Sequence, residues 1–419
     1  MENLLRNVTL WFCRIQSLKT KIRIQVKKLL VPCLLLLASC SKNFHEQSAT
    51  TINSDKETCT FGLSEFNMTK RPTINTEIGK GKPGTGNGGG GGTTSGGGGG
   101  TTQTPASVIY LDFNGQYVAN TMWNVNGPMT VTPANLTTEE INLIFQRVAA
   151  DFSPFNVTVT TDEAVFNAGN PYKRIRIIVT ESWEWFGQAG GVSYLNSFTW
   201  GDGTPSFVFS SLLNYNVKTV AEACSHEAGH TLGLRHQSLY DANGVKLNEY
   251  NWGQGSGEIG WAPIMGASYN ENLSLWHNGP NSLGATYIQD DVAKIAAVVG
   301  FVNDEFSNTS ASATTLSGSK TGLINSSTDV DFFSVNTQQT KTLSLTPVNV
   351  GPNNDGGNLD LLLNIYNSQG ALISSINDPL ILNAGISLAP GSYYISAGTV
   401  ENQFASKYGM LSKYVITVN

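Results

Sequence analysis

The chain has 419 residues, of which 13% are charged, and a formal net charge of −6 at pH 7. This mild acidity gives no basic surface for nucleic acid, and the length suggests two or three domains. Only two of the five cysteines, Cys59 and Cys224, lie beyond residue 40, so the chain is not built on a disulfide framework, although a bridge between these two stays open.

The first 40 residues have the pattern of a secretion signal. Six basic residues lie between positions 14 and 28, and an apolar run from 29 to 38 follows, too short to cross a membrane as a helix. The run ends in Leu-Ala-Ser-Cys, which resembles the lipobox of bacterial lipoproteins and implies cleavage before Cys40 and a lipid on its sulfur. We expect a lipid-anchored protein of the bacterial cell envelope, periplasmic or at the cell surface; a simple secretion signal with an incidental cysteine is the alternative.

Residues 41–104 have a composition that does not favour a packed core. Positions 41 to about 78 are polar with little periodicity, and positions 79–104 are rich in glycine and threonine. We predict a disordered segment and a flexible, Gly-rich linker that holds the rest of the chain off the membrane. A phosphate-binding loop is not favoured, because no strand precedes the glycines and no Lys-Ser/Thr pair ends them.

Residues 105–303 combine strand and helix patterns, which predicts an α+β domain with a mixed sheet. Apolar residues at helical spacing predict a helix over 136–151 with Thr138 at its N-cap, and a second helix is predicted to begin after Asn216. Alternating apolar residues predict strands at 107–113, 156–161, 174–180, 190–195 and 206–209.

The most informative stretch, 226–236, reads His-Glu-Ala-Gly-His-Thr-Leu-Gly-Leu-Arg-His. His226 and His230 are four residues apart, so a helix places both imidazoles on one face, where they can bind one Zn²⁺. Gly233 tolerates the left-handed conformation that ends a helix, so His236 can turn back as the third ligand. Glu227 points beside the metal, where it can act as a general base on water. Three protein ligands leave one position for water, which indicates a catalytic zinc.

Two downstream segments extend this pattern. Met265 lies in a Pro-Ile-Met-Gly turn. Together with the long histidine motif, this turn resembles the Met-turn of the metzincin zinc endopeptidases, in which the methionine forms an apolar floor under the metal. Residues 287–300 contain a Gln-Asp-Asp run followed by apolar residues at helical spacing, and they resemble the C-terminal helix of the matrixins.

The resemblance to metzincins carries further expectations. It implies an active-site helix beside a mixed sheet and an edge strand, here 190–195, that pairs with extended substrate. Some subgroups place a tyrosine two residues after the methionine, near the zinc and the oxyanion. Here Tyr269 follows Met265 by four, so core packing and a place beside the zinc are both open. Cys59 could cap the zinc, as a prodomain cysteine does in matrixins, although its Thr-Cys-Thr context lacks that motif.

Residues 304–419 show short alternating strands between turns, which predicts an all-β sandwich domain. The Asp-x-Asp-Phe-Phe segment at 329–333 and the Gly-Ser-Tyr-Tyr-Ile segment at 391–395 resemble the bacterial prepeptidase C-terminal domain, which accompanies secreted peptidases. Its aspartates could hold Ca²⁺ or simply cap turns. The candidates are Asp329, Asp331, Asp355 and Asp360.

These patterns together predict a secreted, membrane-anchored zinc endopeptidase of metzincin type that acts on proteins or peptides. Zinc is the expected cofactor, and nucleic acid is not an expected partner. Two alternatives remain: a binding or adhesion lipoprotein on a metalloprotease scaffold, and a zinc hydrolase of cell-wall peptides. The sequence does not indicate the oligomeric state or the cleavage specificity.

Overall fold

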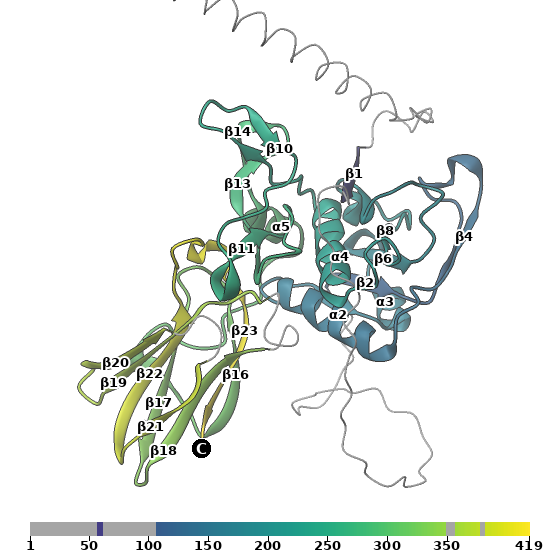
Figure 1. The fold of residues 1–419 in the computed structure, drawn as a ribbon. Coiled ribbons are helices and arrows are strands. Elements are labelled where there is room, and N and C mark those ends of the chain that lie inside the picture. Colours follow the sequence, from purple (N-terminus) through teal and green to yellow (C-terminus); the bar gives the residue numbers. More distant parts are fainter. Residues whose placement is uncertain (1–56, 62–105, 349–356, 378–381) are drawn as a thin grey trace, which may run out of the picture. The chain divides into compact units, whose positions relative to one another are not determined.

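The computed structural model describes residues 57–61, 106–348, 357–377 and 382–419 (Figure 1). These residues belong to one compact unit, Asp55–Asn419. The expected signal segment 1–40, with Cys40, and most of the expected segment 41–104 lie outside the described residues. Within 41–104 the structure describes positions 57–61, and it places four of them in a strand. Among the described residues, no helix is both long and apolar enough to cross a membrane.

A six-stranded mixed sheet organises the first part of this unit, with the strand order β1-β7-β8-β6-β2-β5. The bounds in that order are Thr58–Phe61, Gly191–Tyr194, Ser206–Phe209, Arg174–Thr180, Val108–Asp112 and Thr158–Thr160. Strands β8, β6, β2 and β5 are parallel, whereas β7 is antiparallel to β8 and β1 is antiparallel to β7. The five strands expected from the sequence are present, some of them shorter, and β1 is additional.

Two long helices, α2 (Thr138–Asp151) and α4 (Val217–Thr231), pack on one face of the sheet (Figure 1). The predicted N-cap of α2 is off by one residue. Thr137 accepts a hydrogen bond from the Glu140 amide, while the Glu140 carboxylate accepts from the Thr137 amide. This reciprocal pair of hydrogen bonds makes Thr137, and not Thr138, the N-cap of the helix.

The other face of the sheet carries a second apolar cluster that includes Ile178, Phe207 and Phe209. The hairpin of β3 (Gln116–Val118) and β4 (Met129–Val131) supplies Val118 and Val131 to it. A short helix, α3 (Glu163–Ala168), follows β5. Along β6, Ile175, Ile177 and Val179 belong to the cluster under the helices, whereas Ile178 belongs to the second cluster, so apolar residues of this strand pack on both faces of the sheet.

Residues between α4 and the sandwich form three small sheets and one helix. The pairs are β9 (Leu239–Tyr240) with β10 (Lys246–Asn248), β11 (Trp261–Pro263) with β12 (Leu273–Leu275), and β13 (Asn278–Asn281) with β14 (Gly284–Asp290). Helix α5 (Asp291–Val299) begins after Asp290, whose carboxylate accepts from the Ala293 amide. The predicted helix in 287–300 is present, but its first four residues belong to β14.

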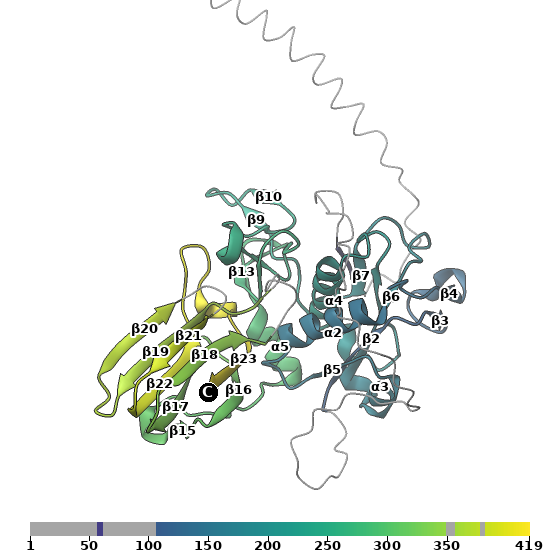
Figure 2. The ribbon, with the colours of Figure 1, turned by 60° about the horizontal axis from the view of Figure 1, so that its bottom comes forward.

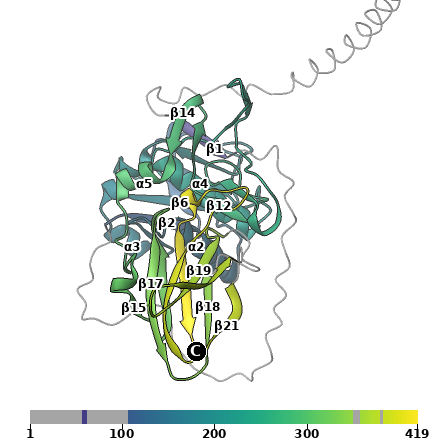
Figure 3. The ribbon, with the colours of Figure 1, turned by 90° about the vertical axis from the view of Figure 1, so that its left-hand side faces the viewer.

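The C-terminal part consists of two facing antiparallel sheets with one parallel edge pair (Figure 2, Figure 3). The first contains β15 (Thr314–Thr315), β17 (Val330–Thr337), β22 (Gly391–Thr399), β19 (Leu361–Asn367) and β20 (Leu372–Asn377). The second contains β16 (Gly318–Ile324), β23 (Ser412–Val418), β18 (Lys341–Pro347) and β21 (Leu382–Leu388). Phe333, Leu343 and Ile416 pack between them, as alternation along each strand predicts. The described chain is thus α+β and mostly β.

Buried hydrogen bonds cross the expected domain boundary near residue 303. The Asn358 amide donates to Asp151 Oδ1 at 2.8 Å and to the Ser274 carbonyl at 2.6 Å. Asn358 is buried, with 2% of its surface exposed. A further hydrogen bond across this boundary runs from the Trp261 indole to the Phe404 carbonyl. The loops at one end of the sandwich therefore complete the polar environment behind α4.

Replacing Asn358 with Ala should destabilise the whole unit. Asp151 and the Ser274 carbonyl would both lose a buried donor, at a cost of about 1–3 kcal/mol for each unsatisfied group. Thermal unfolding of the full chain measures this loss, and Asn377→Ala, on the exposed edge strand β20, is the matched control. Equal melting temperatures for the two variants would show that the boundary contact contributes nothing.

Candidate metal centre

Helix α4 carries the histidine motif through the middle of the unit. Asn216 caps its start by accepting from the Thr219 amide at 3.1 Å. The residues from Lys218 to Thr231 are all buried, and the helix packs against β7 and β8. Gly233 has a φ of +93°, and a Cβ there would lie 2.5 Å from Asn196 Oδ1, so only glycine fits this turn.

The turn at Gly233 brings the three motif histidines together. One ring nitrogen from each of His226, His230 and His236 lies within 4.8 Å of the other two. The ring centroids are 4.6 Å apart for His226 and His230, 4.9 Å for His230 and His236, and 5.3 Å for His226 and His236. The sequence-based ligand set is therefore one spatial cluster.

The second nitrogen of each ring is held by a separate acceptor. Nδ1 of His226 lies 2.8 Å from the Ile264 carbonyl, and Nδ1 of His230 lies 2.7 Å from the Leu234 carbonyl. Nδ1 of His236 lies 2.7 Å from Glu249 Oε1. These acceptors place the proton on Nδ1 and leave the Nε2 lone pair free for an ion.

The donor set fits zinc. The three Nε2 atoms are buried and make no hydrogen bond within the described part of the chain. Burial, with smaller contributions from the neighbouring imidazoles, lowers the pKa of His226 and His230 well below the ordinary value. Neutral imidazoles in a buried cluster are the form in which histidine binds Zn²⁺.

Glu227 lies beside the cluster and not in it. It is wholly buried, and burial raises the pKa of its carboxyl well above the usual range. Strand β7 passes directly over it, because a Cβ on Gly191 would come within 2.6 Å of Glu227 Oε1. Its two oxygens accept no hydrogen bond from any described residue, so they are available to a small polar molecule such as water.

Met265 lies beneath α4, as the sequence pattern suggests. A Cβ on Gly229 would meet its sulfur at 2.4 Å, so Gly229 makes room for it in the helix. The turn that holds Met265 also supplies the Ile264 carbonyl to His226. Tyr269 is buried farther along, and its ring packs 4.7 Å from the ring of Phe61.

Two further residues beside the cluster, Glu249 and Tyr250, belong to no motif of the sequence. Glu249 bonds to His236 and to Lys246. Burial alone would raise the pKa of Glu249, but these two hydrogen bonds outweigh it and lower the pKa. The Tyr250 ring lies 4.6 Å from the ring of His236, and its hydroxyl donates to the Thr60 carbonyl at 2.7 Å. Both residues lie in a polar loop without periodicity, so only the fold reveals them.

Cys59 and Cys224 are free thiols, so the disulfide between them that the sequence left open is not formed. Cys224 is wholly buried within α4, whereas Cys59 lies in β1 opposite Ser193. Burial, followed by the nearby Glu227, raises the pKa of Cys59 to about 12.

A second group of potential ligands lies in the sandwich. Carboxylate oxygens of Asp304, Asp329 and Asp331 lie within 4.8 Å of one another. Asp329 and Asp331 are therefore brought together as the sequence suggests, and Asp304 was not anticipated. Asp360 is not in this group and accepts from Asn402, while Asp355 lies outside the described residues.

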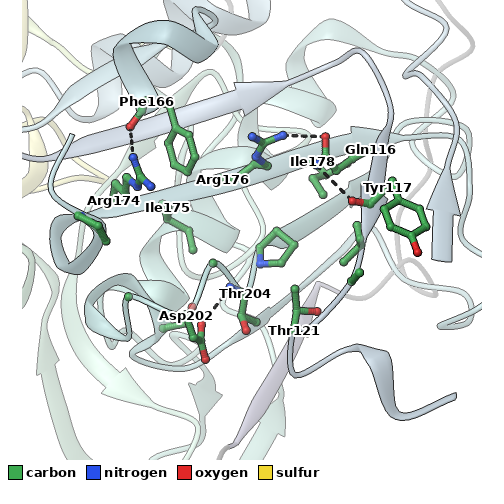
Figure 4. A pocket seen from close by; sticks show the side chains of 17 residues that line it. Gln116, Tyr117, Thr121, Phe166, Arg174, Ile175, Arg176, Ile178, Asp202 and Thr204 are labelled. Atoms are coloured by element: carbon green, nitrogen blue, oxygen red, sulfur yellow. Dashed lines mark hydrogen bonds between the residues drawn. The ribbon is translucent and has the colours of Figure 1, made fainter. Parts of the chain in front are cut away.

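A separate pocket of about 400 Å³ is lined by residues of β3, β6 and the loop 201–205 (Figure 4). Arg176 donates to Asp112 at 2.7 Å and to Gln116 at 2.8 Å, and Arg174 donates to the Phe166 carbonyl at 2.6 Å. Neither group of potential metal ligands among the described residues lies in this pocket. The guanidinium groups of Arg174 and Arg176 already donate hydrogen bonds to protein groups, which indicates a structural role for this cluster.

No protein-family model and no curated protein matches this chain. A solved structure, the pre-peptidase C-terminal domain of a collagenase from Bacillus anthracis, is similar over 26% of this chain and 92% of its own, with 14% identity and a TM-score of 0.18. PliG, a periplasmic lysozyme inhibitor of g-type lysozyme from Aeromonas hydrophila, is similar over 26% of this chain and 97% of its own, with 10% identity and a TM-score of 0.16. These weak, partial likenesses do not identify a function.

Replacing Glu249 with Gln should weaken zinc binding without abolishing it. The carboxylate that orients His236 would be lost, and the loss of such an outer partner typically costs about 10–100-fold in metal affinity. Competition with a chromogenic chelator measures the affinity of the full chain. Lys246→Gln removes the ammonium that contacts Glu249 and the Ser282 carbonyl but leaves the Glu249–His236 contact, and it should change the affinity much less. Equal effects of the two variants would show that His236 is oriented by other groups.

Proposed function

We propose that this chain is a zinc-dependent endopeptidase of the metzincin type. The observation that carries the proposal is the convergence of three buried imidazole Nε2 atoms, which make no hydrogen bond to a described residue, beside the buried carboxylate of Glu227. Met265 under α4 and the antiparallel strand β7 above Glu227 add to the resemblance seen in the sequence. Extended proteins or peptides are the proposed substrates.

His226, His230 and His236 would hold the zinc ion. When bound, Zn²⁺ supplies Lewis acidity that lowers the pKa of water and polarises a carbonyl group. Glu227 takes a proton from the attacking water and returns it to the leaving amine, as a general base and then a general acid. Its buried site favours this role, because burial raises the pKa of the Glu227 carboxyl and so makes the carboxylate a stronger proton acceptor.

Two other functions are compatible with the same cluster: a binding lipoprotein on this scaffold, and a hydrolase of cell-wall peptides. The lone pairs of the Glu227 carboxylate and of the three imidazole Nε2 atoms accept no hydrogen bond from a described residue, which favours catalysis over binding alone. Casein, gelatin and cell-wall material, each incubated with the zinc-loaded chain with and without chelator, separate the three. Cleavage of cell-wall material alone would support the hydrolase, and no cleavage would support the binding protein.

Glu227→Gln should retain one zinc per chain and lose peptidase activity. The side chain keeps its size but no longer accepts a proton, and loss of general-base catalysis costs about 10²–10⁴-fold in rate. Zinc content by atomic emission and casein cleavage are the paired measurements, with the exposed Glu139→Gln as control. A variant that loses zinc together with activity would contradict the assignment of Glu227 as base rather than ligand.

We also propose that the Asp304–Asp329–Asp331 group binds a calcium ion. Asp331 is wholly buried and Asp329 is 4% exposed, yet Oδ1 of each accepts no hydrogen bond from a described residue. A hard, oxygen-binding cation would neutralise this group. Burial, with a smaller contribution from the nearby carboxylates, raises the pKa of Asp331 to about 8, while burial raises the pKa of Asp329 to about 6.

Calcium should raise the melting temperature of the full chain, and more so as pH rises. Both raised pKa values mean that the folded, metal-free chain holds protons that the unfolded chain releases near 3.8. The associated stability is therefore present at low pH and is lost as pH rises through about 6 and about 8, whereas calcium binds the deprotonated form.

Calorimetry of the full chain from about pH 5 to about pH 9, with calcium or chelator, measures how the calcium-dependent rise in melting temperature changes with pH. Asp331→Asn should abolish the calcium effect and the exposed Glu401→Gln should not; a calcium effect that survives in Asp331→Asn would contradict the site.

Attachment to the cell envelope is proposed through a lipid on Cys40. Cys40→Ala should move the protein from the membrane to the soluble fraction, because each buried CH₂ of a lipid chain contributes about 0.8 kcal/mol. Detergent phase partitioning measures the distribution, and Cys33→Ala, within the expected signal, is the control. Unchanged partitioning of the Cys40 variant would rule out lipid at that residue.

A further inference from the structure

Strand β1 is the first strand of the sheet in chain order, and it pairs with β7. Its register pairs Thr58 with Tyr194 and Phe61 with Gly191 in antiparallel orientation. The Gly190 amide donates to the Phe61 carbonyl, and the Leu195 amide donates to the Glu57 carbonyl at 2.9 Å. Without β1, β7 would be the edge of the sheet, and an exposed edge is where an extended peptide adds as a further strand.

The side chain of Phe61 is buried among aromatic rings beside the histidine cluster. Its ring is fully buried and stacks on the His226 imidazole at 4.1 Å, with 18° between the planes. Tyr269 lies 4.7 Å away and Tyr250 lies 5.9 Å away, so aromatic rings surround it. A Cβ on Gly190 would meet Leu213 at 3.3 Å, which shows how closely this end of β7 is packed. The pocket therefore accepts a large, flat, apolar side chain from a strand on β7.

The backbone carbonyl just before Phe61 is held by a hydroxyl. Tyr250 donates to the Thr60 oxygen at 2.7 Å, and the Tyr250 ring lies 4.6 Å from His236. On the other side, Phe61 pairs with Gly191, which passes over Glu227. The peptide bond between Thr60 and Phe61 is thus placed next to the histidine cluster, with a donor on its carbonyl.

We propose that residues 57–61 occupy the chain's own substrate groove in the orientation of a substrate, so that Tyr250 binds the carbonyl of the bond to be cleaved and the Phe61 pocket selects a bulky aromatic residue immediately after that bond. This inference rests on the proposed peptidase function. It assigns a carbonyl-binding residue and a specificity pocket that no sequence pattern shows. The substrate class is an extended peptide with an aromatic side chain in the Phe61 position.

The assigned roles are consistent with peptide hydrolysis. Water oxygen adds to the carbonyl carbon as Glu227 takes one proton, and the negative charge that develops on the carbonyl oxygen receives a hydrogen bond from the Tyr250 hydroxyl. The C–N bond then breaks, and the leaving amine takes the proton from Glu227. The products are a carboxylic acid and a peptide whose new N-terminus is the aromatic residue.

The same placement makes β1 a competitor of substrate. A peptide can pair with β7 and fill the aromatic pocket only after residues 57–61 have left the edge. The Arg235–Glu57 ion pair and the Tyr250–Thr60 hydrogen bond hold the two ends of the segment in place.

Occupancy is tested without any catalysis by hydrogen exchange of the full chain. Phe61→Asp should release β1, because a carboxylate cannot stay among these rings, and the Gly190 and Leu195 amides should then exchange several-fold faster. Thr58→Ala, on the same strand, is the control, and Phe61→Leu should give an intermediate rate. A peptide with the sequence of residues 57–61 should restore protection in Phe61→Asp, and the same peptide with Ala for Phe should not. Unchanged exchange in Phe61→Asp, with zinc still bound, would overturn the proposal.

The assigned roles are tested on zinc-loaded Phe61→Asp with short peptides that contain Thr-Phe. Cleavage should fall before Phe, and Ala in place of Phe should lower kcat/KM roughly 10–200-fold. Adding Tyr250→Phe should lower kcat about 10²–10³-fold with little change in KM or zinc content, whereas Tyr240→Phe should not. Cleavage without preference for an aromatic residue, or full activity of Tyr250→Phe, would overturn these roles and leave the peptidase intact. If no peptide is cleaved while the exchange result holds, the peptidase proposal fails and β1 remains a bound strand.

Discussion

The arrangement of this site depends on the three acceptors that fix the imidazole rings. Each comes from a different segment: the Ile264 carbonyl from the methionine turn, the Leu234 carbonyl from the turn after α4, and Glu249 from a polar loop. Two residues four positions apart on a helix can align their rings, but only tertiary structure can aim three lone pairs at one point. The small sheets between α4 and the sandwich are therefore part of the centre, because two of the three acceptors directly follow their strands: Glu249 follows β10 and Ile264 follows β11.

A buried polar network continues behind α4. Lys218 and Glu222 form an ion pair, and Glu222 also accepts from Ser268 and Ser274. Ser225, immediately before His226, donates to Asp151. Because every one of these groups is buried, each unsatisfied member would cost on the order of 1–3 kcal/mol, and the network fixes the rotation of α4 about its axis. The sandwich contributes to it through Asn358, so the two expected domains share a polar core.

Much of this arrangement is predictable from local patterns. The start of α4 at Asn216, the left-handed Gly233 and strands 174–180 and 206–209 follow from capping, backbone freedom and alternation, which are properties of neighbouring residues. The pattern of histidines predicts their convergence for the same reason. Glu249, Tyr250 and Asp304 were not predictable, because their partners are brought to them by long-range pairing. Strand β1 was missed because its composition resembles the polar segment around it, and its stability comes from β7 and the rings it contacts.

The connection between β1 and β2 has a further consequence. Both strands belong to one chain, so the return of β1 to the edge of β7 is a unimolecular event, and its probability does not depend on the amount of protein. A separate peptide meets the same edge in proportion to its concentration. Dilution therefore leaves occupancy of the β7 edge by β1 unchanged, while it lowers occupancy by any free ligand. If the chain were cut between β1 and β2, β1 would itself become a free ligand, and its occupancy would fall on dilution.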